Sequence, residues 1–114
     1  MLMVSLDKLV VTDIRRPTIV HSQKGRFFQM KNRQYFGLSL CLSGQITYIM
    51  NGKRFISDPD HAILLPRGGA YCLVGDREGQ FPVINFSCNA LDCKEITVLP
   101  IGDPQACLQR FQIL

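Results

Sequence analysis

Apolar and polar residues alternate with a period of two over most of the chain, which is typical of β-strands and not of helices. Apolar stretches predict strands over residues 35–42, 46–50, 55–56, 63–65, 71–74, 81–88 and 96–99. Because Gly and Pro separate these stretches at a spacing of roughly ten residues, the chain is expected to form an antiparallel sandwich or small barrel.

Turn-forming residues lie between the predicted strands. Asn51-Gly52 is the strongest short hairpin signal, since both residues tolerate the positive φ of a type I′ turn. Asp58-Pro59-Asp60 combines an Asx side chain with a Pro whose φ is already set. These positions predict a two-residue hairpin after residue 50 and a turn before residue 61.

A helix is predicted only at the C-terminus. Asp103 can cap it, and Pro104 suits its first position. Cys107, Phe111 and Leu114 then fall on one helical stripe. Because this pattern stops without a C-cap, we expect the chain to be part of a longer protein and the stripe to serve dimerisation; a terminal helix docked on its own domain is the alternative.

Composition and charge exclude several classes of protein. The chain has 114 residues, of which 46% are apolar, and its net charge is +4. This size and composition predict one globular domain, and the scattered basic residues predict no continuous phosphate-binding stripe. Residues 1–8 lack the apolar segment of a signal peptide, and residues 62–66, the longest apolar run, are too short to cross a bilayer. No membrane partner is therefore expected, and five cysteines without a CxxC pair suggest reduced thiols and hence a cytoplasmic protein.

One set of turn residues resembles a known motif. The spacing of Asp60, Pro66, Gly68, Tyr71 and Gly75 is similar to the second conserved motif of the cupin superfamily. Pro66 and Gly68 match that motif, whereas the other three replace its Gly, His and Asn. The resemblance implies an all-β, antiparallel cupin-type jelly-roll, a double-stranded β-helix barrel, followed here by the predicted C-terminal helix.

The metal-binding positions of that motif carry other residues here. Counting back from Gly44, which resembles the Gly that closes the first cupin motif, Gly37 stands where the metal-binding Glu would be. The remaining ligand positions are taken by Tyr71 and by Met30 and Asn32 or Lys31 and Arg33, depending on spacing. None of these residues is a good ligand for a divalent metal, so we expect a barrel without metal or other cofactor.

A longer stretch, residues 33–86, resembles the N-terminal sensing domain of AraC/XylS-type bacterial transcription regulators. The similarity lies in RQYFGLSL at 33–40, LSG at 42–44, DPDHAILLP at 58–66 and INF at 84–86. It implies an effector-binding domain over residues 1–102 and the start of a linker or dimerisation helix over 103–114. The implied protein is a homodimer that binds a small effector, such as a sugar, and contacts DNA only through a helix-turn-helix half absent from this chain.

Several side chains are candidates for effector binding. Tyr71 occupies a cupin ligand position, so its hydroxyl is expected to face the barrel interior, either as a ligand contact or bonded to the backbone. By strand parity, Tyr35 and Ser39 should share the inward face of Gly37, which leaves room there. Asn85 should face opposite to Ile84 and Phe86, in the pocket or at its rim. Arg33 is the best candidate for a charged contact, with an exposed surface arginine as the alternative.

Catalysis receives less support from the sequence. No Ser/His/Asp or Cys/His arrangement follows from the spacing, and no catalytic residue is predicted. A metal-independent cupin enzyme such as a sugar isomerase would need His61 and Tyr71 as its acid–base pair. A stand-alone carbohydrate-binding or oligomerisation module is a further alternative. The leading hypothesis is therefore a sensing domain and not an enzyme.

Overall fold

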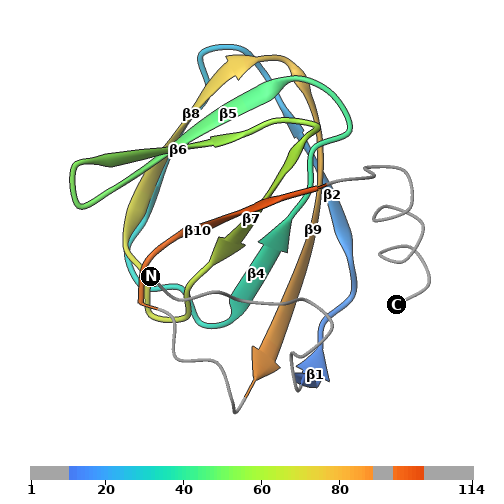
Figure 1. Ribbon diagram of the computed structural model, residues 1–114, viewed down its shortest axis with the longest axis vertical. Coiled ribbons are helices and arrows are strands. Elements are labelled where there is room, and N and C mark those ends of the chain that lie inside the picture. Colours follow the sequence, from blue (N-terminus) through green and yellow to red (C-terminus); the bar gives the residue numbers. More distant parts are fainter. Residues whose placement is uncertain (1–10, 89–93, 102–114) are drawn as a thin grey trace.

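The computed structural model describes residues 11–88 and 94–101, and this part of the chain consists of β-strands, turns and loops (Figure 1). The strands are β1 (Val11–Ile14), β2 (Thr18–Ser22), β3 (Phe27–Met30), β4 (Phe36–Ser39), β5 (Gln45–Met50), β6 (Lys53–Ser57), β7 (His61–Leu65), β8 (Tyr71–Arg77), β9 (Gly79–Cys88) and β10 (Thr97–Pro100). The predicted all-β class is confirmed. The predicted helix over residues 103–114, with its stripe of Cys107, Phe111 and Leu114, lies outside the described residues.

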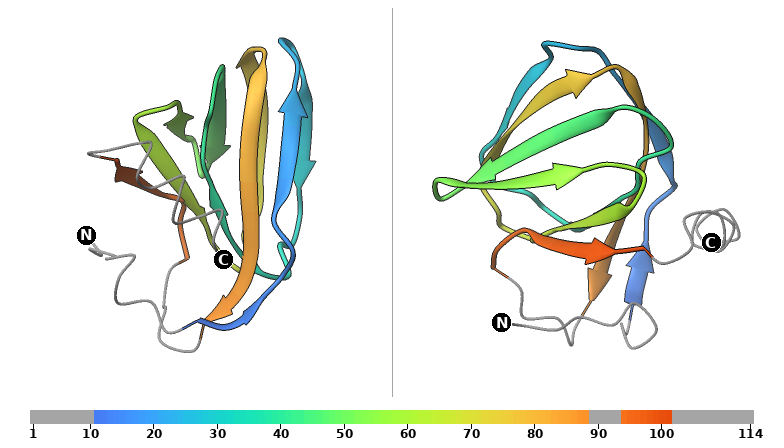
Figure 2. Two further views of the ribbon diagram at one scale, coloured as in Figure 1. Left: turned by 90° about the vertical axis from the view of Figure 1, so that its right-hand side faces the viewer. Right: turned by 45° about the horizontal axis from the view of Figure 1, so that its top comes forward.

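The strands form two antiparallel sheets that face each other (Figure 2). The larger sheet has the order β1-β9-β4-β7-β10, and β2 also pairs with β9. The smaller sheet has the order β3-β8-β5-β6. Every strand pairing is antiparallel, as expected for a jelly-roll built from two packed sheets.

The predicted hairpin between β5 and β6 is confirmed. Asn51 and Gly52 have φ values of 52° and 77°, as a type I′ turn requires, and Met50 pairs with Lys53 across it. The turn before β7 also forms as predicted: the Asp58 carboxylate accepts a hydrogen bond from the Asp60 backbone N–H at 2.9 Å.

The main core lies between the two sheets. Its largest fully buried apolar side chains are Phe81 from β9, Ile63 from β7 and Ile46 from β5. Residues that alternate with them in the strands point the other way, as the period-two pattern predicts. Residues of both sheets therefore line the interior of the barrel.

The larger sheet is also buried on its outer face over β4, β7 and β9. Phe36 and Phe86 stack there with ring centroids 5.8 Å apart, beside Leu64 and Ile84. Strand β7 consequently buries both of its faces, which explains its uninterrupted apolar sequence from Ala62 to Leu65. Ile84 and Phe86 lie together in this outer cluster, in keeping with the shared face that the sequence pattern predicts for them.

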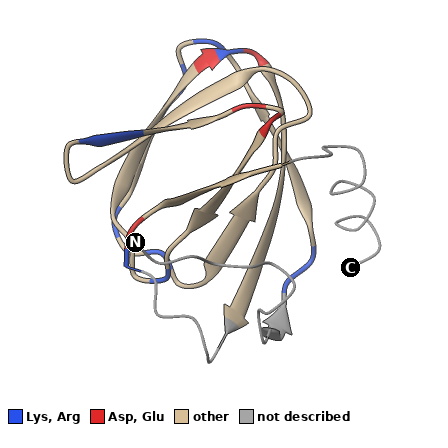
Figure 3. Cartoon of the chain, in the orientation of Figure 1, with Lys and Arg blue, Asp and Glu red and all other residues tan. Residues whose placement is uncertain are grey.

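Charged residues lie mostly at strand ends and in loops, and Lys53 and Arg54 stand at the start of β6 (Figure 3). Strands β1 to β3 were not predicted from the pattern. Strands β2 and β3 are largely exposed, and Ser22 is the one residue of the two that is fully buried, so they lack the apolar alternation of a half-buried strand. The predicted strand over 35–42 is regular only in β4; beyond it, Leu40 and Leu42 still donate backbone hydrogen bonds to Pro82 and Gln80.

Candidate functional site

The candidate site is built around Arg33, which lies in the loop between β3 and β4. The backbone of Arg33 pairs with the β7–β8 turn: its N–H donates to the Gly69 carbonyl at 3.1 Å, and its carbonyl accepts from the Gly68 N–H at 2.6 Å. Gly68 has a φ of 77°, which a glycine adopts without steric cost. Two loops at one end of the barrel, at the lower left of Figure 1, thus hold Arg33 in place.

The Arg33 side chain extends inward and is only 9% exposed. Its Nε donates to the Tyr71 hydroxyl at 3.3 Å, and its Nη2 donates to Asn85 Oδ1 at 2.8 Å. A third bond joins Nη1 to the Tyr35 carbonyl at 2.9 Å. The structure therefore brings three predicted site residues, Arg33, Tyr71 and Asn85, into one hydrogen-bonded cluster, which we call the arginine cluster.

Gly37 makes room for the guanidinium. Gly37 pairs with Asn85 on one side and with Leu65 on the other, so its Cα faces the interior between two strands. A Cβ at position 37 would lie 2.7 Å from Arg33 Cζ and would clash with Nη2. The space beside Gly37, where the cupin motif would have its Glu side chain, is therefore filled by the guanidinium of Arg33, which comes from the loop before β4.

Tyr48 and Ser39 continue the polar groups further into the interior. The rings of Tyr48 and Tyr71 meet edge to face with centroids 5.6 Å apart. Burial raises the pKa of the Tyr48 phenol to about 12, and the nearby Ser39 hydroxyl opposes part of that rise. The Ser39 hydroxyl is fully buried and has no hydrogen-bond partner among the residues that the structure describes.

Tyr48 was not among the sequence-predicted site residues. Its side chain alternates with Thr47 and Ile49 on β5, and the pairing of Tyr48 with Leu73 on β8 places it inward. Its parity within residues 46–50 was visible in the sequence. What could not be read there was that β5 pairs with β8, which brings Tyr48 next to Tyr71.

Tyr35 is placed differently from the prediction. Its hydroxyl accepts a hydrogen bond from Arg15 Nη2 at 2.6 Å in an exposed contact, and the Arg15 guanidinium lies 4.9 Å from the ring centroid. Only the Tyr35 backbone carbonyl joins the arginine cluster. The inward direction expected from strand parity fails because Tyr35 precedes β4, which begins at Phe36.

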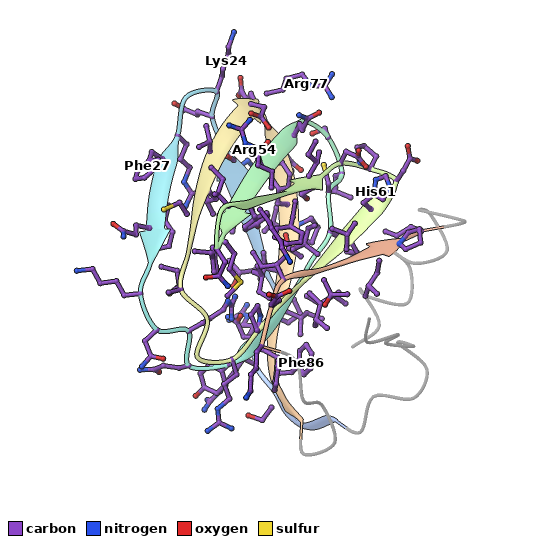
Figure 4. The ribbon with its side chains drawn as sticks, turned by 60° about the vertical axis from the view of Figure 1, so that its left-hand side comes forward. Lys24, Phe27, Arg54, His61, Arg77 and Phe86 are labelled. Carbon is purple, nitrogen blue, oxygen red and sulfur yellow. The ribbon has the colours of Figure 1, made fainter. Side chains whose placement is uncertain are left out.

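The candidate acid–base pair is not assembled. His61 Nδ1 lies 2.7 Å from Asp58 Oδ1 at the start of β7, where Asp58 and His61 form an isolated bridge. Tyr71 bonds instead with Arg33. Figure 4 shows His61 near one edge of the molecule, far from the end marked by Phe86. No hydrogen bond joins His61 to Tyr71, both of which the structure describes.

The metal positions of the cupin motif carry no ligand set. Among residues 11–88 and 94–101, no group of three His, Cys, Asp or Glu side chains could hold a metal ion. Burial raises the pKa of the Cys41 thiol to about 11, and the Asp58 carboxylate adds to the rise, so this thiol is neutral at neutral pH. No helix in the same described ranges is long and apolar enough to span a membrane.

Solved structures with the same fold include ToxT from Vibrio cholerae, an AraC-family regulator. An apo ToxT variant from strain SCE256 superposes with a TM-score of 0.69 at 8% identity over 90% of this chain and 48% of ToxT. ToxT from strain O395 gives 0.67 and 13% identity over 88% of this chain and 45% of ToxT. The same protein has been solved with (E)-4-(8-methylnaphthalen-1-yl)but-3-enoic acid bound.

A second similar structure is the conserved SPY1581 protein of unknown function from Streptococcus pyogenes, with a TM-score of 0.58 and 16% identity over 77% of this chain and 82% of that one. No protein-family model matches the chain, and no curated protein does. The chain spans about half the length of the ToxT structures. At these identities the similarity shows a shared fold.

Proposed function

We propose that this chain is the effector-sensing domain of an AraC-type transcription regulator. The observation that carries the proposal is the agreement in fold, over 90% of this chain, with about half of ToxT, a regulator that has been solved with a small organic acid bound. The segments that resemble the AraC/XylS sensing domain in sequence, residues 33–40, 58–66 and 84–86, form β4, β7 and β9 around the interior. Fold alone does not define function, so the site supplies the second support.

The arginine cluster, with Tyr48 and Ser39 beside it, gives the interior a polar end next to a largely apolar core. Effector sites commonly combine apolar walls with a few convergent polar groups that orient the ligand. Arg33, Tyr71 and Asn85 provide such groups from one loop and two strands of opposite sheets. A ligand held there would contact both sheets and could favour one arrangement of the barrel over another.

Regulation would follow from this difference in affinity. A ligand that binds one conformation better shifts the population toward it, typically by a coupling of about 1–3 kcal/mol. DNA contact would be made by a helix-turn-helix half outside this chain, and residues 107, 111 and 114 would contribute to a homodimer. We place no catalytic step and no metal in this mechanism.

The experiment that tests the proposal is a ligand screen on residues 1–114 by thermal unfolding, followed by calorimetric titration of each compound that raises the midpoint. We expect at least one small metabolite to raise the midpoint by several degrees and to bind with one-to-one stoichiometry. A library that contains sugars, organic acids and neutral compounds and yields no ligand would overturn the effector proposal.

Two controls define what this chain does by itself. In gel-shift assays, residues 1–114 should show no sequence-specific DNA binding that survives physiological salt. In light scattering, Phe111→Asp should lower the molar mass of any dimer to that of a monomer. Salt-resistant specific DNA binding would contradict the assignment of DNA contact to a separate half.

A further inference from the structure

The guanidinium of Arg33 is a buried cation whose hydrogen bonds with the described residues all run to neutral groups. Its three hydrogen bonds run to a phenol, a backbone carbonyl and a side-chain amide. Within the described ranges, it contacts no carboxylate. Moving a charge out of water is costly unless it is paired, and proteins rarely bury a cation without an anion beside it.

The arginine cluster also has more donors than acceptors. A guanidinium offers five N–H groups and no acceptor, and Arg33 uses three of them. The Tyr71 hydroxyl and the Asn85 carbonyl oxygen already accept from Arg33, which leaves the phenolic O–H and the amide NH₂ as further donors. A ligand that completes this cluster must therefore supply acceptors, and a negative charge would neutralise the cation.

The surroundings of the cluster favour an organic anion. The two loops that hold Arg33, residues 31–35 and 66–70, contain Lys31 and Arg67, both exposed, and no Asp or Glu. On the inner face, apolar side chains adjoin the cluster: Leu65 lies opposite Gly37, and Met30 lies opposite Tyr71. An acid with an apolar body matches both surroundings better than inorganic phosphate or a sugar, whose hydroxyls would need acceptors as well as donors.

We propose that the effector is a monocarboxylate, and that Arg33 binds its carboxylate with Tyr71 and Asn85 as additional hydrogen-bond donors. Gly37 is the specificity-determining position, because the absence of a Cβ there lets the guanidinium lie against the sheet. A guanidinium binds a carboxylate through two parallel N–H···O bonds, which fixes the orientation of the ligand. This inference rests on the proposed function and replaces the sugar suggested by the sequence resemblance with an acid.

The test compares acids with their neutral analogues. Butanoate, octanoate and 4-phenylbutanoate are titrated into residues 1–114 beside the primary amide of each and beside arabinose and glucose, all at one ionic strength. We expect at least one acid to bind tenfold or more tightly than its amide. Three results would each contradict the proposal that the effector is a monocarboxylate: equal affinity for acid and amide, binding by the sugars alone, or no binding by any of the acids.

Variants then locate the binding. Arg33→Gln should reduce the preference for acid over amide to about one, whereas Arg54→Gln, a matched change on an exposed strand, should leave it unchanged. Arg54 pairs with Ile49, which alternates with the inward Tyr48 on β5, so the Arg54 side chain lies on the outer face of the sheet. If Arg33→Gln fails to fold, Gly37→Ala keeps the charge but displaces the guanidinium, and Tyr71→Phe removes one donor. Gly37→Ala should weaken acid binding by tenfold, and Tyr71→Phe should weaken it by a few fold. Unchanged acid affinity in these two variants would overturn the proposed site.

The outcomes separate this inference from the proposed function. If the broad ligand screen finds a neutral effector whose binding is unaffected by Arg33→Gln, the proposed sensing function is supported and the proposed carboxylate site is contradicted. If neither the screen nor the acids give a ligand, both the proposed sensing function and the proposed carboxylate site are contradicted. In a third outcome, an acid binds but Arg33→Gln and Gly37→Ala leave its affinity unchanged; the site assignment is then wrong while the ligand class is right.

Discussion

The interior of the barrel has two parts in which burial has opposite effects on the free energy of folding. Around Phe81, Ile46 and Ile63, burial removes apolar surface from water and directly favours folding. Around Arg33, burial removes a charge and several hydrogen-bonding groups from water, and the bonds formed offset that cost only in part. The first part has a sufficient explanation in stability. The second does not, which is why we assign it to binding.

The largest effect in this comparison is expected in the apolar part. Phe81→Ala should lower the free energy of unfolding by about 3–5 kcal/mol, because a side chain that is 1% exposed leaves a cavity between both sheets. Phe27→Ala is the matched control, since Phe27 is 65% exposed and points away from the barrel in Figure 4. Urea unfolding of both variants measures the difference. A similar loss in both would show that the interior is not close-packed.

The next largest effect concerns Tyr48, which lies between the two parts. Its pKa in the folded protein is raised to about 12 from an ordinary value of 10.0, chiefly by burial. The unfolded chain therefore loses the phenolic proton first as pH rises, and the stabilising contribution that is complete below pH 10 disappears by about pH 12. The expected loss is about 2–3 kcal/mol.

Tyr48→Phe serves as the reference for this pH dependence. The difference in unfolding free energy between wild type and Tyr48→Phe should stay constant below pH 10 and then decline toward pH 12. Because other groups titrate equally in both proteins, the comparison isolates the Tyr48 phenol. A difference that does not change with pH would mean that the phenol reaches water in the folded state.

The sequence predicted the apolar part well and the polar part incompletely, for one physical reason. Period-two alternation assigns faces within a strand, and it placed Asn85 opposite to Ile84 and Phe86 as the structure has them. Alternation says nothing of which strands become neighbours. The contact between Tyr48 and Tyr71 depends on the pairing of β5 with β8, which lie far apart in sequence.

Residues outside regular strands were harder still. Arg33 precedes β4, and its side chain direction is set by backbone bonds to the β7–β8 turn instead of by strand parity. The same loop turns Tyr35 outward to Arg15. The absence of a side chain at Gly37 was the signal that could be read from sequence, since it left a space facing the interior; that an arginine fills it required the structure.

In the polar part, Arg33→Met tests whether the arginine cluster serves folding. Without ligand, we expect the free energy of unfolding to change by less than about 1 kcal/mol in either direction, because replacing a poorly compensated buried cation with an apolar side chain relieves desolvation while losing three hydrogen bonds. Urea unfolding again measures the change. A loss above about 3 kcal/mol would show that Arg33 is a structural tie between the two sheets.

The smallest effect is expected at the outer edge of the polar part, where the two tyrosines nearest Arg33 differ. Tyr71 is 6% exposed and bonds with Arg33 through its side chain, whereas Tyr35 bonds with Arg15 in an exposed contact. Tyr35→Phe should therefore cost less than about 1 kcal/mol of stability, because exposed contacts of this kind contribute little. Carboxylate affinity should also be unchanged, since the Tyr35 carbonyl that meets Arg33 is retained. Calorimetric titration of Tyr35→Phe and Tyr71→Phe side by side makes the comparison. If Tyr35→Phe weakens ligand binding as much as Tyr71→Phe does, the ligand reaches the outer side of the loop, and the binding surface is wider than the arginine cluster.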